Sequence, residues 1–365
     1  MGETLTRTIC IKLDVDGHEQ ALQGTQLHFN AAASWIASVC WDERITNTNT
    51  AHHRVYGETR TRFGLGAQLA VCARAKAMEA IKAIKTQEKQ RRGHQRKNRP
   101  PPKPATYPQF GPRGSVRYDA RTYRLLWGKR QHEMLVDPQW EIGGADLVWR
   151  RGVYYLHVTQ STEAPSITET PDAIGVDLGI VNVATDSTGE RFTGARVREV
   201  RNRSVKRRAA LQRVGTRSAQ RRLKQMSGRE QRFMKDINHT ISTALVKKAV
   251  VWRKALALED LTGIRDRTMV RREDRDARHS WAFNQLRTYI VYKAAWAGVQ
   301  VRFVDPAYTS QTCSQCGHGE RANRQSQASF QCRQCGCCLN ADINAATNIS
   351  LAEPVKRPIV APVRE

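Results

Sequence analysis

The chain has 365 residues, and its 60 Lys and Arg against 34 Asp and Glu give a formal net charge of +26. So large a positive excess argues against an enzyme that acts on small neutral substrates and predicts a polyanionic partner. No stretch holds the roughly 18 consecutive apolar residues of a membrane span, and the N-terminus lacks the apolar core of a signal peptide. We therefore expect a nucleic-acid-binding protein with no membrane partner.

The first half of the chain predicts a small β-domain that is interrupted by helices. Residues 4–15 alternate, with Ile9, Ile11 and Leu13 on one face, which indicates a half-buried strand. Residues 26–41 and 65–85 are Ala-rich with helical spacing. Strand patterns return at 116–127 and 146–160, and the second of these bends at Arg151 and Gly152 as a hairpin does.

The second half predicts an alternation of strands and helices. Residues 173–177 and 250–261 indicate buried strands, 181–194 a hairpin that follows the first of them, and 298–306 a further strand. An Arg-rich helical stretch extends to about residue 250, with a break at Ser227 and Gly228. A helix capped by Ser280 and a final helix from about Ala341 complete the pattern.

The positive charge is concentrated in two segments. Residues 201–235 hold 13 Lys and Arg and one acid, and residues 82–103 hold nine and one. So few acids leave little scope for the ion pairs of an ordinary solvated helix, so we interpret both segments as phosphate-binding surfaces. The residues predicted to contact nucleic acid are Arg91, Arg92, Arg96, Lys97, Arg99, Arg201, Arg203, Lys206, Arg207, Arg208, Arg213, Arg217, Arg221, Arg222 and Lys224.

Six of the nine cysteines lie within residues 313–338, which predicts metal ligation in a reducing compartment. Two Cys-x2-Cys pairs, fifteen residues apart, match the template of a closed, structural Zn²⁺ site with four thiolates. The predicted ligands are Cys313, Cys316, Cys332 and Cys335.

The zinc ligands have alternatives. Cys337 and Cys338 leave the register of the second pair open, because Cys335-x-Cys337 could substitute for it, and His318 is a weaker candidate. We expect the remaining cysteines to be small core residues: Cys10, Cys40 and Cys72.

Three acids stand where strands end or a helix begins. Asp177 and Glu259 each close an apolar strand, and Asp342 enters the last helix. A carboxylate at the end of a buried strand needs a cation or hydrogen-bond donors, and three that converge could bind two Mg²⁺ ions on either side of a phosphate. Taken singly, each has a structural alternative: a turn for Asp177, a solvated strand end for Glu259 and an N-cap for Asp342. Asp260 is the nearest rival of Glu259.

Together these motifs resemble the TnpB family of transposon-encoded, RNA-guided endonucleases, which are related to type V CRISPR effectors. The resemblance rests on VDLG at 176–179, LEDL at 258–261, and the C-terminal pattern TSQTCSQCG…FQCRQCG…NADINAATNI. It implies an α+β multidomain protein: an N-terminal β-barrel-like domain with a helical insertion, then an RNase H-like (RuvC) α/β nuclease domain with an inserted zinc ribbon.

The expected domains are a β-rich wedge-type domain at 1–20 and 105–171, a helical recognition insertion at 21–104, a RuvC nuclease domain at 172–304 and 340–365, and a zinc ribbon that binds target nucleic acid at 305–339. The resemblance further implies that Asp177, Glu259 and Asp342 bind Mg²⁺, that a guide RNA comes from the transposon end, and that double-stranded DNA is cut beside a short target-adjacent motif. A prokaryotic cytoplasmic location, at the nucleoid when DNA is bound, is implied as well.

Other functions remain open from the sequence. The chain could be a compact type V CRISPR effector, which differs in genomic context rather than chemistry. It could also be an RNA-guided DNA-binding regulator whose nuclease is idle. A strand-transfer transposase would not need a guide RNA, and a plain zinc-ribbon DNA-binding protein would leave the three acids unexplained.

Overall fold

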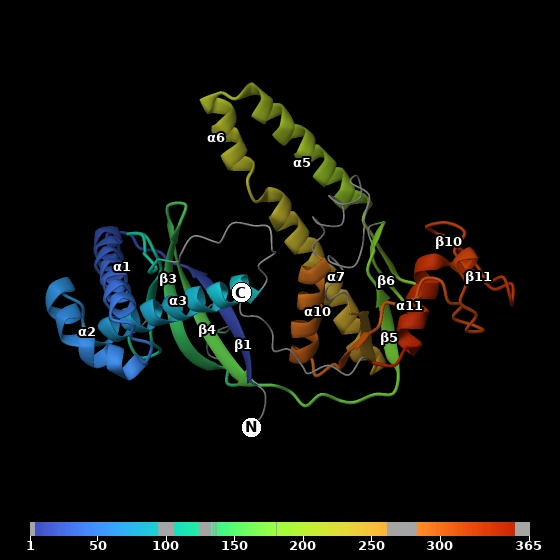
Figure 1. The fold of residues 1–365 in the computed structure, drawn as a ribbon, viewed down its shortest axis with the longest axis horizontal. Coiled ribbons are helices and arrows are strands. Elements are labelled where there is room, and N and C mark those ends of the chain that lie inside the picture. Colours follow the sequence, from blue (N-terminus) through green and yellow to red (C-terminus); the bar gives the residue numbers. More distant parts are fainter. Residues whose placement is uncertain are drawn as a thin grey trace. The chain divides into compact units, whose positions relative to one another are not determined.

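The computed structural model describes residues 4–93, 106–123, 133, 135, 137–179, 181–260 and 283–354. The chain divides into two compact units, Met1–Glu163 and Ala164–Glu365 (Figure 1). Each unit combines a β-sheet with helices, which agrees with the predicted α+β class. Among the helices of the described residues, none is both long enough and apolar enough to cross a bilayer.

Unit 1 contains a four-stranded antiparallel sheet in the order β1-β4-β3-β2. Its strands are β1 (Thr4–Lys12), β2 (Val116–Tyr118), β3 (Glu141–Arg150) and β4 (Val153–Glu163). Arg151 and Gly152, both with positive φ, form the two-residue turn between β3 and β4 and confirm the predicted hairpin. Because β1 and β2 are the edges of this described sheet, barrel closure stays a prediction.

Three helices lie between β1 and β2 in the chain. They are α1 (Glu19–Asp42), α2 (Thr48–Phe63) and α3 (Ala67–Gly93). Their apolar faces share one core with the inner face of the sheet, and this core contains Phe29 and Ile36 of α1 as well as Ile9 and Ile11 of β1.

The prediction that Cys10 is a core residue is wrong. Cys10 alternates with the buried Ile9 and Ile11, so its side chain points to the opposite face of β1 and is exposed. Cys40 and Cys72, on helices α1 and α3, are buried as predicted.

Unit 2 contains a five-stranded sheet in the order β7-β6-β5-β8-β9. β5, β6 and β7 pair antiparallel, whereas β5, β8 and β9 pair parallel. The strands are β5 (Ala173–Asp177), β6 (Asn182–Asp186), β7 (Arg191–Thr193), β8 (Ala255–Glu259) and β9 (Val301–Val304).

Helices cover both faces of this sheet. Ile174 and Val176 of β5 share a core with Leu245 of α7 and Ile290 of α10, whereas Ala257 of β8 packs with residues of α11 on the other face. The helices are α5 (Ala195–Val214), α6 (Arg217–Met226), α7 (Arg229–Trp252), α10 (Phe283–Trp296) and α11 (Ala341–Leu351). The alternation along β5 thus separates an α7/α10 face from an α11 face.

Most predicted elements of unit 2 are present, but the Arg-rich helical stretch has a further, unpredicted break at Gly215, and one predicted strand begins late. The break before α7 lies at Ser227 and Gly228 as predicted, while the predicted cap Ser280 lies outside the described residues. The strand predicted at 250–261 begins only at Ala255, because residues 250–252 continue α7 and Arg253 ends that helix with positive φ. Val251 is 76% exposed, so its β-branched side chain reflects the helix surface rather than a buried strand.

Candidate functional site

The three predicted acids converge at one edge of the sheet of unit 2. Asp177 is the last residue of β5 and Glu259 the last residue of the adjacent parallel strand β8. Asp342 lies in the first turn of α11, which packs on β5. The N-cap alternative for Asp342 is wrong, because the side chain of Asn340 caps α11 by accepting from the N–H groups of Asp342 and Ile343.

The carboxylates at this edge act on one another. Burial, and after it the charges of Glu259 and Asp342, raises the pKa of Asp177 to about 7, while Arg324 opposes the rise. Burial also raises the pKa of Glu259, against a hydrogen bond from Thr309 that lowers it. Negative charge held together in a buried cluster is the situation that a divalent cation with oxygen ligands relieves. Carboxylate oxygens are also the donors that Mg²⁺ prefers, so the residue types at this edge suit that ion.

Three polar side chains fix the orientation of two of these carboxylates. Thr309 Oγ1 donates to Glu259 Oε1 at 2.6 Å, and Asn182 Nδ2 donates to Asp342 Oδ2 at 2.8 Å. Arg324 Nη2 lies 3.5 Å from Asp342 Oδ1. Sequence reasoning missed all three residues. The available signal was weak: Thr309 stands four residues before the first cysteine of the metal motif, and Arg324 stands between the two cysteine pairs.

Asp260, the rival of Glu259, faces the other layer of unit 2. Its side chain lies 3.8 Å from Arg287 Nη2 on α10, and its N–H donates to the carbonyl of Val304 at 2.8 Å. Because side chains alternate along a strand, Glu259 points to the α11 face and Asp260 to the α10 face. Only Glu259 therefore lies on the same face as Asp342.

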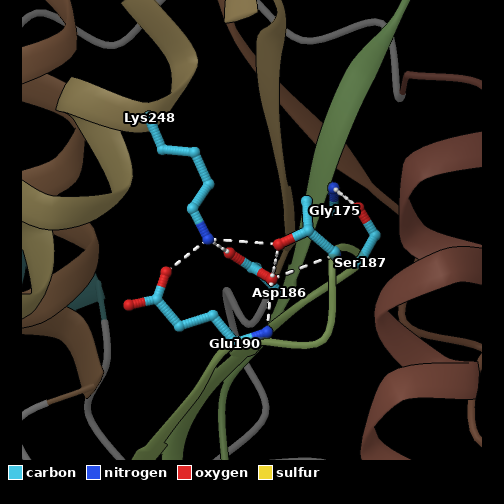
Figure 2. Close-up of polar contacts among 6 residues, drawn as sticks. Gly175, Asp186, Ser187, Glu190 and Lys248 are labelled. Carbon is cyan, nitrogen blue, oxygen red and sulfur yellow. Dashed lines mark hydrogen bonds and ion pairs between the residues drawn. The ribbon is translucent and has the colours of Figure 1, made fainter. Parts of the chain in front are cut away.

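Asp186 is a further buried acid, and its contacts stabilise the fold. Asp186, at the end of β6, is fully buried and pairs with Lys248 of α7, which also contacts Glu190 (Figure 2). The neighbouring Ser187 donates its N–H to Gly175 O at 2.9 Å and accepts the Gly175 N–H at 3.2 Å. These contacts hold the turn between β6 and β7 against β5 and α7, beside the strand that ends in the candidate site.

The four predicted zinc ligands lie together. Their sulfur atoms are all within 4.8 Å of one another, with 3.7 Å between Cys313 and Cys335 and 3.6 Å between Cys316 and Cys332. Tetrahedral Zn²⁺ with bonds of about 2.3 Å requires sulfur separations of roughly 3.8 Å. The cluster could therefore hold a structural zinc ion.

The two cysteine pairs have the same local geometry. Each is followed by a glycine with positive φ, Gly317 or Gly336, whose N–H donates to the carbonyl of the first cysteine of its pair at 2.9 and 3.0 Å. In the second pair, the N–H of Cys335 points to the sulfur of Cys332 at 3.5 Å. This contact, together with the N–H of Gln334 and the neighbouring thiols, lowers the pKa of the Cys332 thiol to about 6. Such turns aim backbone amides at the thiolates and favour metal binding.

The alternative ligands are not members of this group of four. Cys338 is exposed and its thiol donates to the carbonyl of Gly336 at 3.4 Å. The ring of His318 contacts Glu320 at 3.3 Å. Cys337 is half-buried against the small apolar core of the ribbon, next to Cys313.

The predicted nucleic-acid-binding residues of unit 2 lie on α5 and α6, two helices that form a hairpin extending from the sheet (Figure 1). Ala219 of α6 is buried. Nine of the ten predicted basic residues of the hairpin are exposed, and Arg201 is half-buried. Of the other predicted residues, Arg91 and Arg92 lie in the last turn of α3, and Arg96, Lys97 and Arg99 lie outside the described residues.

Two family models match the chain. Residues 156–262 match the family described as "Probable transposase" (OrfB_IS605), and residues 283–349 match "Cas12f1-like, TNB domain". The first range contains Asp177 and Glu259, and the second contains Asp342 and the four clustered cysteines.

Curated relatives agree with these families. The chain is 29% identical to "CRISPR-associated endodeoxyribonuclease Cas12f1" of Sulfoacidibacillus thermotolerans, over 61% of this chain and 56% of that protein. It is 32% identical to "TnpB-like protein MJ0751" of Methanocaldococcus jannaschii, over 35% of this chain and 45% of that protein. It is 29% identical to "Putative RNA-guided DNA endonuclease InsQ" of Escherichia coli strain K12, over 55% and 54%.

The chain thus spans about half the length of the curated relatives that it matches. Among solved structures, CasPhi-2 (Cas12j) bound to crRNA aligns over 98% of this chain and 99% of that chain, with 11% identity and a TM-score of 0.49. The family models and the named relatives confirm the predicted resemblance to the TnpB family.

Proposed function

We propose that the chain is an RNA-guided DNA endonuclease encoded by an insertion sequence, which cuts target DNA at a single RuvC-type site. The observation that carries the proposal is the convergence of Asp177, Glu259 and Asp342 at the ends of β5 and β8 and the start of α11. Relatives named as endodeoxyribonucleases and RNA-guided DNA endonucleases support the reaction class.

In this proposal the three carboxylates hold two Mg²⁺ ions, which would supply an activated water and stabilise the leaving oxygen of the phosphodiester. The other residues of the site orient these carboxylates and attract the phosphate. Thr309 and Asn182 fix the Glu259 and Asp342 carboxylates, and Arg324 brings a positive charge to the same edge, where a phosphate would arrive. The four cysteines hold a zinc ion whose role is structural.

The proposed partners are a guide RNA transcribed from the transposon end and a double-stranded DNA target with an adjacent motif. The charge of +26 and the exposed basic face of α5 and α6 support a polyanionic ligand that is held by its phosphates. Sequence choice would then come from base pairing with the guide rather than from side chains.

The test begins with sequencing the RNA that co-purifies with the chain, which would identify the guide. A plasmid with the matching target is then incubated with the complex in Mg²⁺ or in EDTA. We expect Mg²⁺-dependent cutting that Asp177→Ala, Glu259→Gln and Asp342→Ala each abolish, while RNA-guided binding of the target survives.

The matched control is Asp172→Asn, because Asp172 is an exposed acid beside β5 that pairs with Lys254 and lies outside the cluster. It should cut like the wild type. Retained cutting by any of the three site variants removes that residue from the site. Guided binding without any Mg²⁺-dependent product would instead make the protein an RNA-guided regulator.

A further inference from the structure

The loop that joins β9 to the first cysteine pair is held by hydrogen bonds from side chains of α11. The side-chain amide of Asn348 donates to the carbonyl oxygens of Thr309 and Thr312 at 2.8 and 2.7 Å. One helical turn earlier, Asn344 donates to the Thr312 carbonyl at 2.8 Å and accepts the N–H of Ser314 at 3.0 Å. Two asparagines spaced by four residues thus present one polar stripe to the loop.

This stripe belongs to the helix whose first turn carries Asp342. Asn344 is fully buried, so its amide depends on these loop partners for hydrogen bonding. α11 therefore has two roles. It supplies one carboxylate of the candidate site, and its asparagines hydrogen-bond to the backbone of the loop that contains Thr309. The same loop continues into Cys313, the first residue of the cysteine cluster.

From this loop, the Thr309 side chain reaches the carboxylate of Glu259. Thr309 is buried, at 8% exposure, and its hydroxyl donates to Glu259 Oε1 at 2.6 Å. A carboxylate at the end of a strand can rotate about its terminal bond, which has broad torsional preferences. A hydroxyl that occupies one oxygen selects one rotation and leaves Oε2 for another partner.

We infer that Thr309 is a positioning residue of the proposed nuclease site: it holds the Glu259 carboxylate in its ion-binding orientation, and Asn348 keeps the loop where Thr309 can do so. The inference rests on the proposed function, because it takes Glu259 as a ligand of the divalent ion. Thr309 itself does not touch the reacting atoms. Its effect passes through Glu259.

The test measures ion binding apart from DNA cutting. The full chain, freed of RNA, is titrated with Mn²⁺ as a probe for Mg²⁺ and followed by electron paramagnetic resonance. We expect Thr309→Val to weaken Mn²⁺ binding about tenfold, as loss of a hydrogen bond to a charged group does, and Thr309→Ser to stay within about twofold of the wild type. In cleavage assays, Thr309→Val should raise the Mg²⁺ concentration for half-maximal rate more than it lowers the rate at saturating Mg²⁺.

Thr347→Val is the matched control, because Thr347 lies on α11 and its hydroxyl donates to the helix carbonyl of Ile343 at 2.9 Å, away from the loop. It should bind Mn²⁺ like the wild type. Zinc content and melting temperature are measured for every variant. If Thr309→Val loses zinc or melts early, Thr309→Ala, which removes the hydroxyl without adding a methyl group, replaces it in the comparison.

Asn348→Leu tests whether the hydrogen bonds from α11 to the loop are needed to position Thr309. The Asn348 side chain bonds to the backbone carbonyls of Thr309 and Thr312, so a purely local role of the Thr309 hydroxyl predicts unchanged Mn²⁺ binding. The inference predicts weakened binding, and predicts that the double variant with Thr309→Val binds about as weakly as Thr309→Val alone. Additive effects of the two substitutions would contradict the inference that Asn348 acts through Thr309.

Two results overturn the inference in distinguishable ways. If Glu259→Gln weakens Mn²⁺ binding and Thr309→Val does not, Thr309 has no positioning role, but the proposed nuclease site stands. If Glu259→Gln also leaves Mn²⁺ binding unchanged, Glu259 is not an ion ligand, and the proposed function and the inference fail together.

Discussion

Gly175 of β5 lies directly beneath Ala346 of α11. A Cβ atom at position 175 would be 2.0 Å from the carbonyl oxygen of Ala346 and 2.5 Å from the amide nitrogen of Ser350. Only glycine allows helix and strand to approach so closely. Because Asp177 lies two residues after Gly175 and Asp342 four residues before Ala346, this contact sets how near the two carboxylates come.

We expect Gly175→Ala to push α11 away from β5 and separate the acids. Overpacking of this kind typically costs about 1–3 kcal/mol in the free energy of unfolding, and Mg²⁺-dependent cutting should be lost even where the protein remains folded. Urea unfolding and the plasmid assay measure the two effects. Gly57→Ala on α2 is the control: nothing lies within 4 Å of its new Cβ, so stability should rise by up to about 1 kcal/mol. Wild-type cutting by Gly175→Ala would show that this contact does not control the site.

The raised pKa of Asp177 predicts how stability changes with pH without added Mg²⁺. Its value of about 7, against an ordinary 3.8, means that between these pH values the folded chain binds a proton that the unfolded chain has released. The contribution of Asp177 to stability is therefore lost as pH rises from about 4 to about 7. We expect the melting temperature of Asp177→Asn, relative to the wild type, to be higher at pH 7.5 than at pH 5. Added Mg²⁺ should stabilise the wild type at pH 7.5. A difference between the two proteins that does not vary with pH would contradict the shift.

Local patterns predicted much of unit 2. The apolar runs before Asp177 and Glu259 are short and end at an acid, so they predict short strands whose last residue is that acid. The end of α7 was harder, because Val250 and Val251 have strand propensity and nothing local shows that they continue the helix. The exposure of Cys10 follows from strand alternation alone, which should have outweighed the general tendency of cysteine to be buried.

The residues that orient the carboxylates could not be predicted from the sequence. Asn182 contacts Asp342 across 160 positions, and Thr309 contacts Glu259 across 50. Such pairs depend on the crossing of α11 over β5 and on the path of the loop after β9. Asn, Thr and Arg occur throughout the chain, so type and local spacing do not distinguish these residues from surface ones.

The cysteine cluster predicts which thiols retain zinc. Cys332→Ser should lose the metal, because it removes one of four sulfur atoms within 4.8 Å, whereas Cys338→Ser should keep a full equivalent. Zinc content by mass spectrometry and melting temperature of the full chain report the outcome. Cys337→Ser decides the register, because Cys335 and Cys337 form the alternative second pair. Loss of zinc in Cys337→Ser, with zinc retained in Cys332→Ser, would make Cys335 and Cys337 the second pair.

The exposed face of α6 predicts how nucleic-acid binding responds to salt. Arg217, Arg221 and Lys224 recur at helical spacing and are all exposed, and within the described part of the chain no carboxylate lies in ion-pair distance of them. If each contacts a phosphate, replacing all three with Gln should reduce the slope of log binding constant against log salt concentration by about 2 to 3. The measurement is guide-RNA binding across a salt series. Lys254→Gln, which removes a charge already paired with Asp172, serves as the control and should leave the slope unchanged. An unchanged slope in the triple variant would remove this face of α6 from the nucleic-acid surface.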